Sequence, residues 1–198
     1  MWFTQARCDD IIDYEHVLPK MRKSGLRWVL LGVESSRRST LEAFKKNMTP
    51  KDAKRAVKLL KKNDIFAQAM FIIGERKDTI ESIEASRRFM EQLDPDFVIY
   101  AILTPFPGTE LFEEAKSKGW VEDFNWSNYD MVHAIMPTEA LSRKEVQKEL
   151  YKCYRRFYGS WRRRMQGLFS RNELKRRVYW YMLGRGIVEQ LQTLFRAL

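Results

Sequence analysis

Short apolar runs alternate with amphipathic segments along the first 118 residues of the chain. The apolar runs are 2–7 (WFTQAR), 26–33 (LRWVLLGV), 66–73 (FAQAMFII) and 97–103 (FVIYAIL). Runs of this length and composition are typical of strands that are covered on both faces. Because segments of helical spacing separate the runs, the pattern predicts βα units with right-handed crossovers and a parallel sheet.

Capping signals predict where the intervening helices begin and end. Gly25 is expected to stop the first helix. The apolar face of that helix comprises Ile11, Tyr14, Leu18 and Met21. The pair Thr49–Pro50 suits the N-cap and first position of a second helix. Asp78 with Glu81 has the spacing of a capping box for a third, and a short fourth helix is predicted over about 109–118.

The pattern changes at Gly119. An aromatic-rich connector without a clear period covers 119–142, and Ser142 with Glu145 then has the spacing of another capping box. The helix that follows carries Val146, Leu150, Cys153, Tyr154 and Phe157 on one face. We therefore expect three parts: βα units over 1–118, a connector over 119–142, and a helical extension over 143–198.

Charge is concentrated in that extension. Residues 1–142 hold 21 Lys and Arg against 22 Asp and Glu, whereas 143–198 hold 15 against 4. No apolar run approaches the roughly 20 residues that span a bilayer, and no signal-peptide pattern is present. Cys8 and Cys153 are too few and too far apart for a disulfide framework or a CxxC metal site. These features predict a protein of a reducing compartment, the cytoplasm.

Candidate chemistry lies where the predicted strands end. Gly32, Glu34 and Ser35 follow the second strand, the segment 74–78 (GERKD) follows the third, and 104–109 (TPFPGT) follows the fourth. In the first strand, Gln5 and Arg7 share a face. The carboxyl ends of parallel strands meet at one edge of a sheet, where these groups can converge on a ligand.

Each of these segments also has a purely structural interpretation. Glu34 is suited to capping the next helix, or to pairing with Arg37 or Arg38. Arg7 is suited to pairing with Asp9 or Asp10. The segment 104–109 is a credible turn in its own right.

The order of the motifs resembles the later half of the radical S-adenosylmethionine core. The segments that carry the resemblance are GLRWVLLGVESSRRSTLEAFKKNMT, AQAMFIIGERKDTIESI and DPDFVIYAILTPFPGTELFEEA. The likeness is strongest to the cobalamin-dependent subgroup that includes the anaerobic magnesium-protoporphyrin monomethyl ester cyclases, and it covers residues 1 to about 118. It implies an α/β fold, a partial (β/α) barrel that supplies roughly the third to sixth strands of a (β/α)₆ core.

The resemblance also implies roles for individual residues. Glu34 and Ser35 would contact the ribose of S-adenosylmethionine. Gln5 and Arg7 would face the barrel mouth, near the methionine carboxylate or the substrate. The strand end at Ile73 and Gly74 would pack against the adenine, with backbone contacts from the strand that ends at Thr104.

Three parts of the family pattern are missing from this sequence. The CxxxCxxC motif that holds a [4Fe–4S] cluster is absent, as are the glycine-rich segment after the second strand and a cobalamin-binding module. Thiolates at defined spacing are needed to hold such a cluster. We therefore expect further strands upstream of Met1, with the N-terminal half of the barrel supplied by the same polypeptide or by another chain. We expect no activity from this chain alone.

The function implied is the S-adenosylmethionine-binding part of a methyltransferase or oxidative cyclase that acts on a small-molecule or lipidic substrate. The alternative is a non-catalytic binding or scaffold module that uses the basic tail. In the tail, Arg162–Arg164 and Lys175–Arg177 alternate with aromatic residues. This mixture suits an anionic membrane surface or, less well, nucleic acid. It equally suits aromatic residues packed on the barrel with arginines facing water.

Overall fold

The structure is a computed structural model. It describes residues 1–46 and 48–196, with side chains up to Gly186. The chain divides into two compact units, residues 1–157 and residues 158–198. The sequence placed a boundary at 142/143 instead. The boundary in the structure falls later because the helix that begins at Arg143 packs within the first unit.

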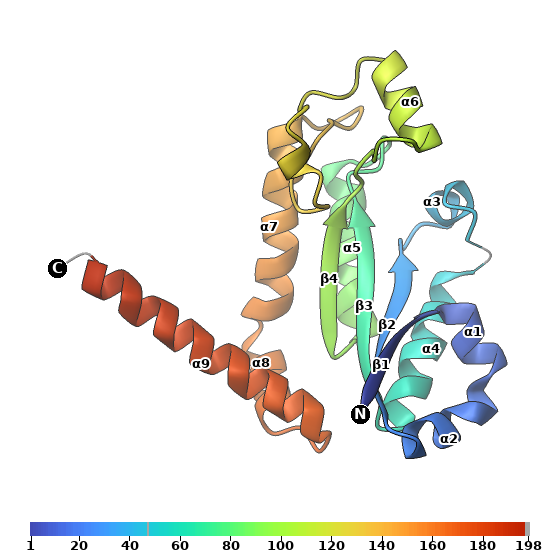
Figure 1. The fold of residues 1–198 in the computed structure, drawn as a ribbon, viewed down its shortest axis with the longest axis vertical. Coiled ribbons are helices and arrows are strands. Elements are labelled where there is room, and N and C mark those ends of the chain that lie inside the picture. Colours follow the sequence, from blue (N-terminus) through green and yellow to red (C-terminus); the bar gives the residue numbers. More distant parts are fainter. Residues whose placement is uncertain (47, 197–198) are drawn as a thin grey trace. The chain divides into compact units, whose positions relative to one another are not determined.

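The first unit is built on a four-stranded parallel sheet in the order β1-β2-β3-β4 (Figure 1). The strands are β1 (Trp2–Arg7), β2 (Leu26–Glu34), β3 (Phe66–Ile73) and β4 (Phe97–Ile102). These bounds agree closely with the four predicted runs. Arg7 lies opposite Gly32, and Gly32 lies opposite Met70, so the carboxyl ends of the strands share one edge.

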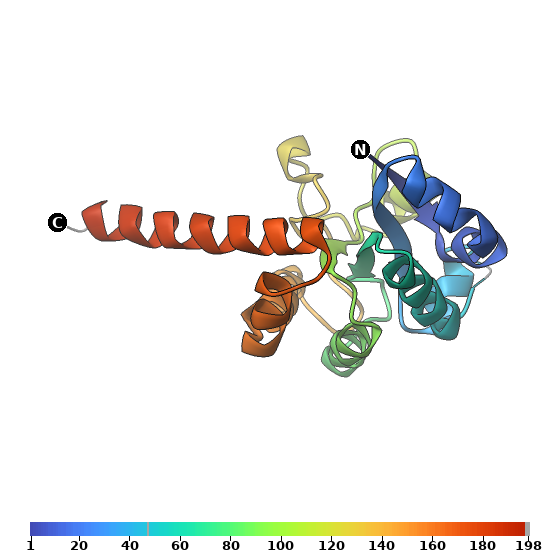
Figure 2. The same cartoon turned by 90° about the horizontal axis from the view of Figure 1, so that it is seen from below.

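The helices of the first unit are α1 (Cys8–Asp13), α2 (Leu18–Lys23), α3 (Arg38–Ala43), α4 (Pro50–Lys62), α5 (Ile80–Leu93), α6 (Glu110–Ser117) and α7 (Arg143–Gly159), with short 3₁₀ turns at Glu15–Val17 and Trp126–Asn128. Seen from below, α4 and α5 lie on the same side of the strands (Figure 2). Val29, Leu31 and Val33 face them and are fully buried. The alternate residues of β2, from Trp28 to Glu34, are partly exposed on the opposite face.

The predicted first helix is wrong as a single element. It is divided into α1, a 3₁₀ turn and α2, because Pro19 lacks an N–H and its ring would clash with the carbonyl four residues earlier. The helix restarts at Leu18, so that Pro19 falls in its first turn. The stop at Gly25 is confirmed by its positive φ of 110°. The short helix α3 was not predicted.

The capping predictions hold in two of three cases. Thr49 and Asp52 form the capping box of α4, and Ser142 and Glu145 bond to each other at the start of α7. The proposed Asp78–Glu81 box is wrong. Thr79 caps α5 together with Ser82, because the carboxylate of Asp78 is already engaged by the preceding loop.

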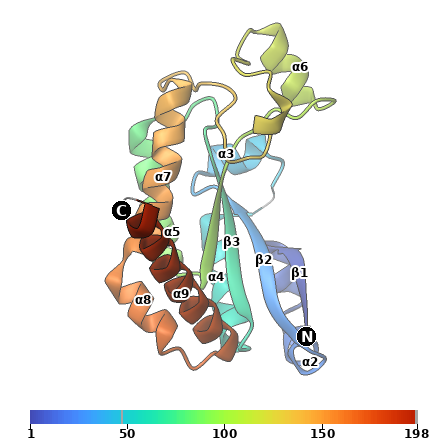
Figure 3. The ribbon, with the colours of Figure 1, turned by 60° about the vertical axis from the view of Figure 1, so that its left-hand side comes forward.

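A buried ion pair joins α5 and α7. Arg87 of α5 donates to Glu149 of α7 at 2.6 Å, and both side chains are more than nine-tenths buried. Cys153 is fully buried beside them, as its place on the apolar face predicted. Figure 3 shows α7 running alongside α5 and β4. The connector packs through a small core of its own, formed by Ala115, Val121, Ile135 and Met136.

The second unit comprises α8 (Trp161–Leu168) and α9 (Glu173–Arg196). Ser160 caps the first of these helices, and the side chain of Asn172 accepts from the Lys175 N–H at the start of the second. No helix in the described part of the chain is long and apolar enough to cross a bilayer.

Candidate functional site

The end of β2 carries an unusual local geometry. Glu34 adopts a left-handed backbone conformation with φ of 62°, and the ladder to β3 shifts register between Gly32 and Glu34. A Cβ placed on Gly32 would lie 2.6 Å from Glu34 Oε1 and 3.4 Å from Lys46 Nζ. The Glu34 carboxylate thus folds back across the strand at Gly32, and a side chain at position 32 would displace it.

Among the described residues, only one of the two oxygens of the Glu34 carboxylate has a polar partner. Its Oε1 pairs with Lys46 Nζ at 3.1 Å, and the Glu34 side chain is 12% exposed. Its Oε2 is buried and has no hydrogen-bond partner among the described residues. A buried acceptor without a donor is costly. The geometry thus suits a ligand that brings a hydroxyl or N–H to this oxygen.

A hollow of about 290 Å³ opens beside this carboxylate. Its lining includes Gln5 and Arg7 from β1, Glu34 from β2, Met70 from β3, and Lys46. Three of the predicted site residues, Gln5, Arg7 and Glu34, are therefore brought together. The hollow presents two cations, the two carboxylates of Asp10 and Glu34, and apolar wall, which suits a ligand that carries both charged groups and hydroxyls.

Arg7 and Glu34 are also held by neighbours. Arg7 forms a two-point ion pair with Asp9, with its Nη2 at 2.6 Å and its Nε at 2.9 Å from the carboxylate oxygens. That hydrogen bond lowers the pKa of Asp9. The structural interpretation of Arg7 thus applies alongside the functional one. Glu34 pairs with Lys46, and the alternatives of a helix cap or a pairing with Arg37 or Arg38 are wrong.

Ser35 contacts its own turn. Its Oγ accepts from the Arg37 N–H at 3.1 Å, its own N–H donates to the Val33 carbonyl, and its side chain is buried. The hydroxyl therefore shapes the β2 exit.

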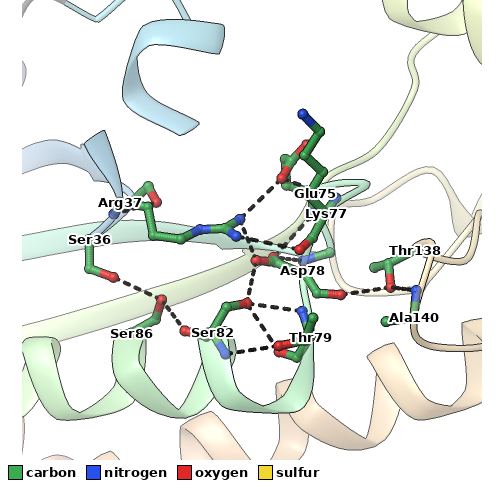
Figure 4. Close-up of polar contacts among 12 residues, drawn as sticks. Ser36, Arg37, Glu75, Lys77, Asp78, Thr79, Ser82, Ser86, Thr138 and Ala140 are labelled. Atoms are coloured by element: carbon green, nitrogen blue, oxygen red, sulfur yellow. Dashed lines mark hydrogen bonds and ion pairs between the residues drawn. The ribbon is translucent and has the colours of Figure 1, made fainter. Parts of the chain in front are cut away.

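Asp78 joins the exits of β2 and β3. Its carboxylate accepts from the Gly74 N–H at 2.9 Å and from Arg37 Nη2 at 2.6 Å, while Arg37 also reaches Glu75 (Figure 4). Ser82 donates to it from α5. Burial raises the pKa of Asp78, although Arg37 and these hydrogen bonds act in the opposite direction. This cluster fixes the two loops that flank the hollow.

The remaining predicted residues point their side chains elsewhere. Phe71 and Tyr100 pack on the helix side of the sheet, and the strand alternation places Ile73 on that side too, 1% exposed. The Ile73 carbonyl accepts from the Leu103 N–H. Gly74 has φ of 80°, and a Cβ there would lie 3.1 Å from Val146. Thr104 Oγ1 donates to the Ile102 carbonyl at 3.0 Å. Contacts from Ile73, Gly74 and Thr104 to a ligand stay a prediction.

Sequence reasoning missed several lining residues, Met70 and Lys46 among them. Met70 has the same strand parity as Gln68 and Ile72, so counting alternate positions along β3 would have found it. Lys46 lies in a loop after α3, where no periodic pattern operates. Its proximity to Glu34 arises from the fold alone.

Comparison with known proteins identifies the family to which this sheet and its helices belong. Residues 3–90 match the model of the radical SAM superfamily. This part of the chain is a radical SAM domain. The sequence resemblance is thereby confirmed. The family uses S-adenosylmethionine and a [4Fe–4S] cluster.

Relatives extend the match beyond residue 90. The anaerobic magnesium-protoporphyrin IX monomethyl ester cyclase of Rubrivivax gelatinosus is 36% identical over 158 residues, which are 80% of this chain and 28% of the relative. An uncharacterized methyltransferase of Pyrococcus horikoshii is 35% identical over 144 residues, which are 73% of this chain and 31% of the relative. The chain therefore spans about three tenths of these relatives.

A solved structure confirms the fold. The radical S-adenosylmethionine methyltransferase TsrM of Kitasatospora setae, with cobalamin and a [4Fe–4S] cluster bound, superimposes with a TM-score of 0.55 at 16% identity. The match covers 74% of this chain and 30% of TsrM. The predicted α/β class and partial barrel are thus confirmed.

Proposed function

We propose that the chain is the S-adenosylmethionine-binding part of a radical SAM enzyme of the methyltransferase or oxidative-cyclase type, acting on a small molecule. The observation that carries this proposal is the buried, unpartnered Glu34 Oε2 beside a hollow of about 290 Å³. S-adenosylmethionine fits this place, because a ribose hydroxyl would donate to the unpartnered oxygen, and the lack of a side chain at Gly32 lets the Glu34 carboxylate lie beside the hollow. When bound, S-adenosylmethionine would supply the methyl group or, with an electron from a cluster held outside residues 1–198, the adenosyl group.

The chain's own residues then have distinct tasks. Glu34 accepts from the ribose, and Lys46 holds the other carboxylate oxygen and so fixes its orientation. Gln5 and Arg7 lie on β1 at the same hollow, where they would receive the methionine carboxylate. The strand end at Ile73 and Gly74 is proposed to pack against the adenine, with backbone contacts from the strand that ends at Thr104.

The residues of this chain do not fit the iron–sulfur cluster. Cys8 and Cys153 are both fully buried, and burial raises their pKa values to about 12 and about 11, which disfavours the thiolate form that binds iron. No group of acidic, His or Cys residues within the described residues is arranged to hold a metal ion. We therefore propose that the cluster, the other half of the barrel and any cobalamin module lie outside residues 1–198, and that this chain alone is inactive.

The S-adenosylmethionine affinity of the Glu34→Gln variant tests the site. Loss of a hydrogen bond to a charged group is worth about 1.5–3 kcal/mol, which is about ten- to a hundredfold in affinity. Glu42→Gln is the matched control, because Glu42 is exposed on α3 and pairs with Arg38 at the surface. Equal affinities for both variants in equilibrium dialysis would remove Glu34 from the site.

The intact mass of the polypeptide from its source cells tests the proposed missing half. A mass well above 23.7 kDa, with CxxxCxxC in the added sequence, is expected. A mass of 23.7 kDa would instead favour the non-catalytic module, which stays a prediction.

A further inference from the structure

The second unit holds a feature that the proposed function leaves unused. Its two helices approach closely where Tyr179 of α9 covers Gly167 of α8, so that any side chain at position 167 would overlap the Tyr179 ring. Tyr179 is 5% exposed. This contact and the two helix caps make the segment 158–186, hereafter the tail hairpin, a defined structure with fixed faces.

An apolar groove lies between the two helices of the tail hairpin. It has a volume of about 500 Å³. Its lining includes Trp161, Met165, Leu168, Met182, Leu183 and Arg164. The walls are thus aliphatic and aromatic, and a single guanidinium lies among them. Such a groove matches a flexible hydrocarbon chain attached to an anionic group.

Large aromatic side chains of the tail hairpin are exposed, and one of them, Trp161, lines the groove. Trp161 is 73% exposed, Phe169 71%, Tyr181 69% and Trp180 53%. A large apolar area left in water marks an interaction surface. Trp and Tyr in particular are suited to the boundary between hydrocarbon and water, because one end of the ring system is apolar and the other is polar.

The charge of the unit is strongly positive. Residues 158–198 hold nine Lys and Arg against two acidic residues, a net charge of +7, whereas residues 1–157 carry +3. Arg164 donates to the Tyr158 carbonyl and Arg176 to the Ser170 carbonyl, at 2.8 and 2.9 Å. Because these acceptors are uncharged carbonyls, the positive charges are not neutralised by them. Basic residues at this density are attracted to anionic lipid headgroups.

We propose that the tail hairpin docks on an anionic lipid bilayer, with an acyl chain in the α8–α9 groove and the arginines on the lipid phosphates. Nucleic acid shares the phosphates but offers no partner to a groove walled by Met and Leu, so the groove favours lipid. The proposal does not depend on S-adenosylmethionine binding by the first unit.

Co-sedimentation of the full chain with vesicles tests this inference. Binding is expected to phosphatidylcholine vesicles that contain phosphatidylglycerol and to be weak with phosphatidylcholine alone. The triple variant Arg162→Glu, Arg164→Glu, Arg176→Glu should lose on the order of a hundredfold in affinity, since each basic residue contributes about fivefold. The control is Lys20→Glu, Lys51→Glu, Lys58→Glu, which makes the same change of charge at exposed positions of the first unit. Circular dichroism of each variant reports whether it is folded.

A second readout addresses the groove itself. Phosphatidylglycerol brominated on its acyl chains should quench the fluorescence of Trp161, and Trp161→Phe should reduce the quenching of the chain. Leu183→Gln should weaken vesicle binding with the charges unchanged. Equal binding to charged and neutral vesicles, an equal loss in both triple variants, or binding only to short DNA or RNA duplexes would overturn the proposal.

Discussion

The hydroxyl of Tyr154 on α7 closes the free edge of β4 at Tyr100. It accepts from the Tyr100 N–H at 3.1 Å and donates to the Tyr100 carbonyl at 2.9 Å. The two rings meet edge to face at 5.6 Å. One side chain thus satisfies both backbone groups that a neighbouring strand would otherwise pair, and α7 terminates the sheet on this side.

Tyr154→Phe tests this closure. The variant should lose about 1–3 kcal/mol of unfolding free energy, because two backbone groups of a buried residue lose their partner. Tyr151→Phe on the exposed side of the same helix should change it by less than about 0.5 kcal/mol. Urea unfolding of the full chain measures the stability of both variants. Equal unfolding midpoints for Tyr154→Phe and Tyr151→Phe would refute the role of Tyr154.

The same contact depends on pH. Burial raises the pKa of Tyr154, although the Tyr100 backbone acts to lower it. The stabilisation should therefore be complete below the unfolded pKa of about 10 and be lost as pH rises through the higher folded value. The stability difference between wild type and Tyr154→Phe should shrink in that alkaline range, and a constant difference would contradict this account.

Gly32→Ala tests the space beside Glu34. The new Cβ would lie 2.6 Å from Glu34 Oε1, so we expect the carboxylate to move and S-adenosylmethionine affinity to fall by about tenfold or more. Gly159→Ala is the control, since no atom lies within 4 Å of a Cβ there. Binding measured by calorimetry should separate the two, and an unchanged affinity for Gly32→Ala would count against the site.

Arg37→Gln tests the link between the two loops. Removal of the guanidinium leaves Asp78 and Glu75 without their cation, and breaking a largely buried pair costs about 3 kcal/mol. Arg38→Gln, on an exposed pair, should cost less than about 1 kcal/mol. Chemical unfolding at neutral pH measures the free energy of unfolding of both variants. A cost for Arg37→Gln no larger than for its neighbour would show that the cluster does not hold the loops.

Glu149→Gln tests the buried pair with Arg87. Burial alone would raise the pKa of Glu149, but hydrogen bonds from Lys152 and Arg87 outweigh it and the pKa is lowered. Its contribution is therefore complete above the unfolded pKa of about 4.3 and is lost as pH falls through the lower folded value. Wild type should lose stability over that acidic range more steeply than Glu149→Gln. Parallel pH profiles would contradict the assignment.

Labelling of the two cysteines tests their proposed inertness. Burial raises both thiol pKa values to about 12 and about 11, so iodoacetamide at neutral pH should modify neither thiol in the folded chain. Both should react after denaturation, as mass spectrometry would show. Rapid labelling of Cys8 in the folded chain would reopen its candidacy as a cluster ligand.

Sequence patterns predicted the strands well because each is a continuous apolar run that ends at turn residues. The patterns failed where other interactions decide the structure. Pro19 divides a helix whose apolar spacing is continuous. Asp78 does not cap α5 as predicted, because its carboxylate accepts from a backbone N–H of the preceding loop. Lys46 reaches Glu34 through tertiary structure that no local pattern encodes. The second-unit groove likewise depends on how α8 and α9 pack.

The central claim is that Glu34 accepts a hydrogen bond from the ribose of S-adenosylmethionine. A double-mutant cycle tests it most directly: the affinities of S-adenosylmethionine and its 2′,3′-dideoxyribose analogue are measured by calorimetry for wild type and Glu34→Gln in the same polypeptide. The account predicts that removing the hydroxyls costs about tenfold or more in wild type and much less in Glu34→Gln. An equal cost in both proteins would show that the ribose is bound elsewhere.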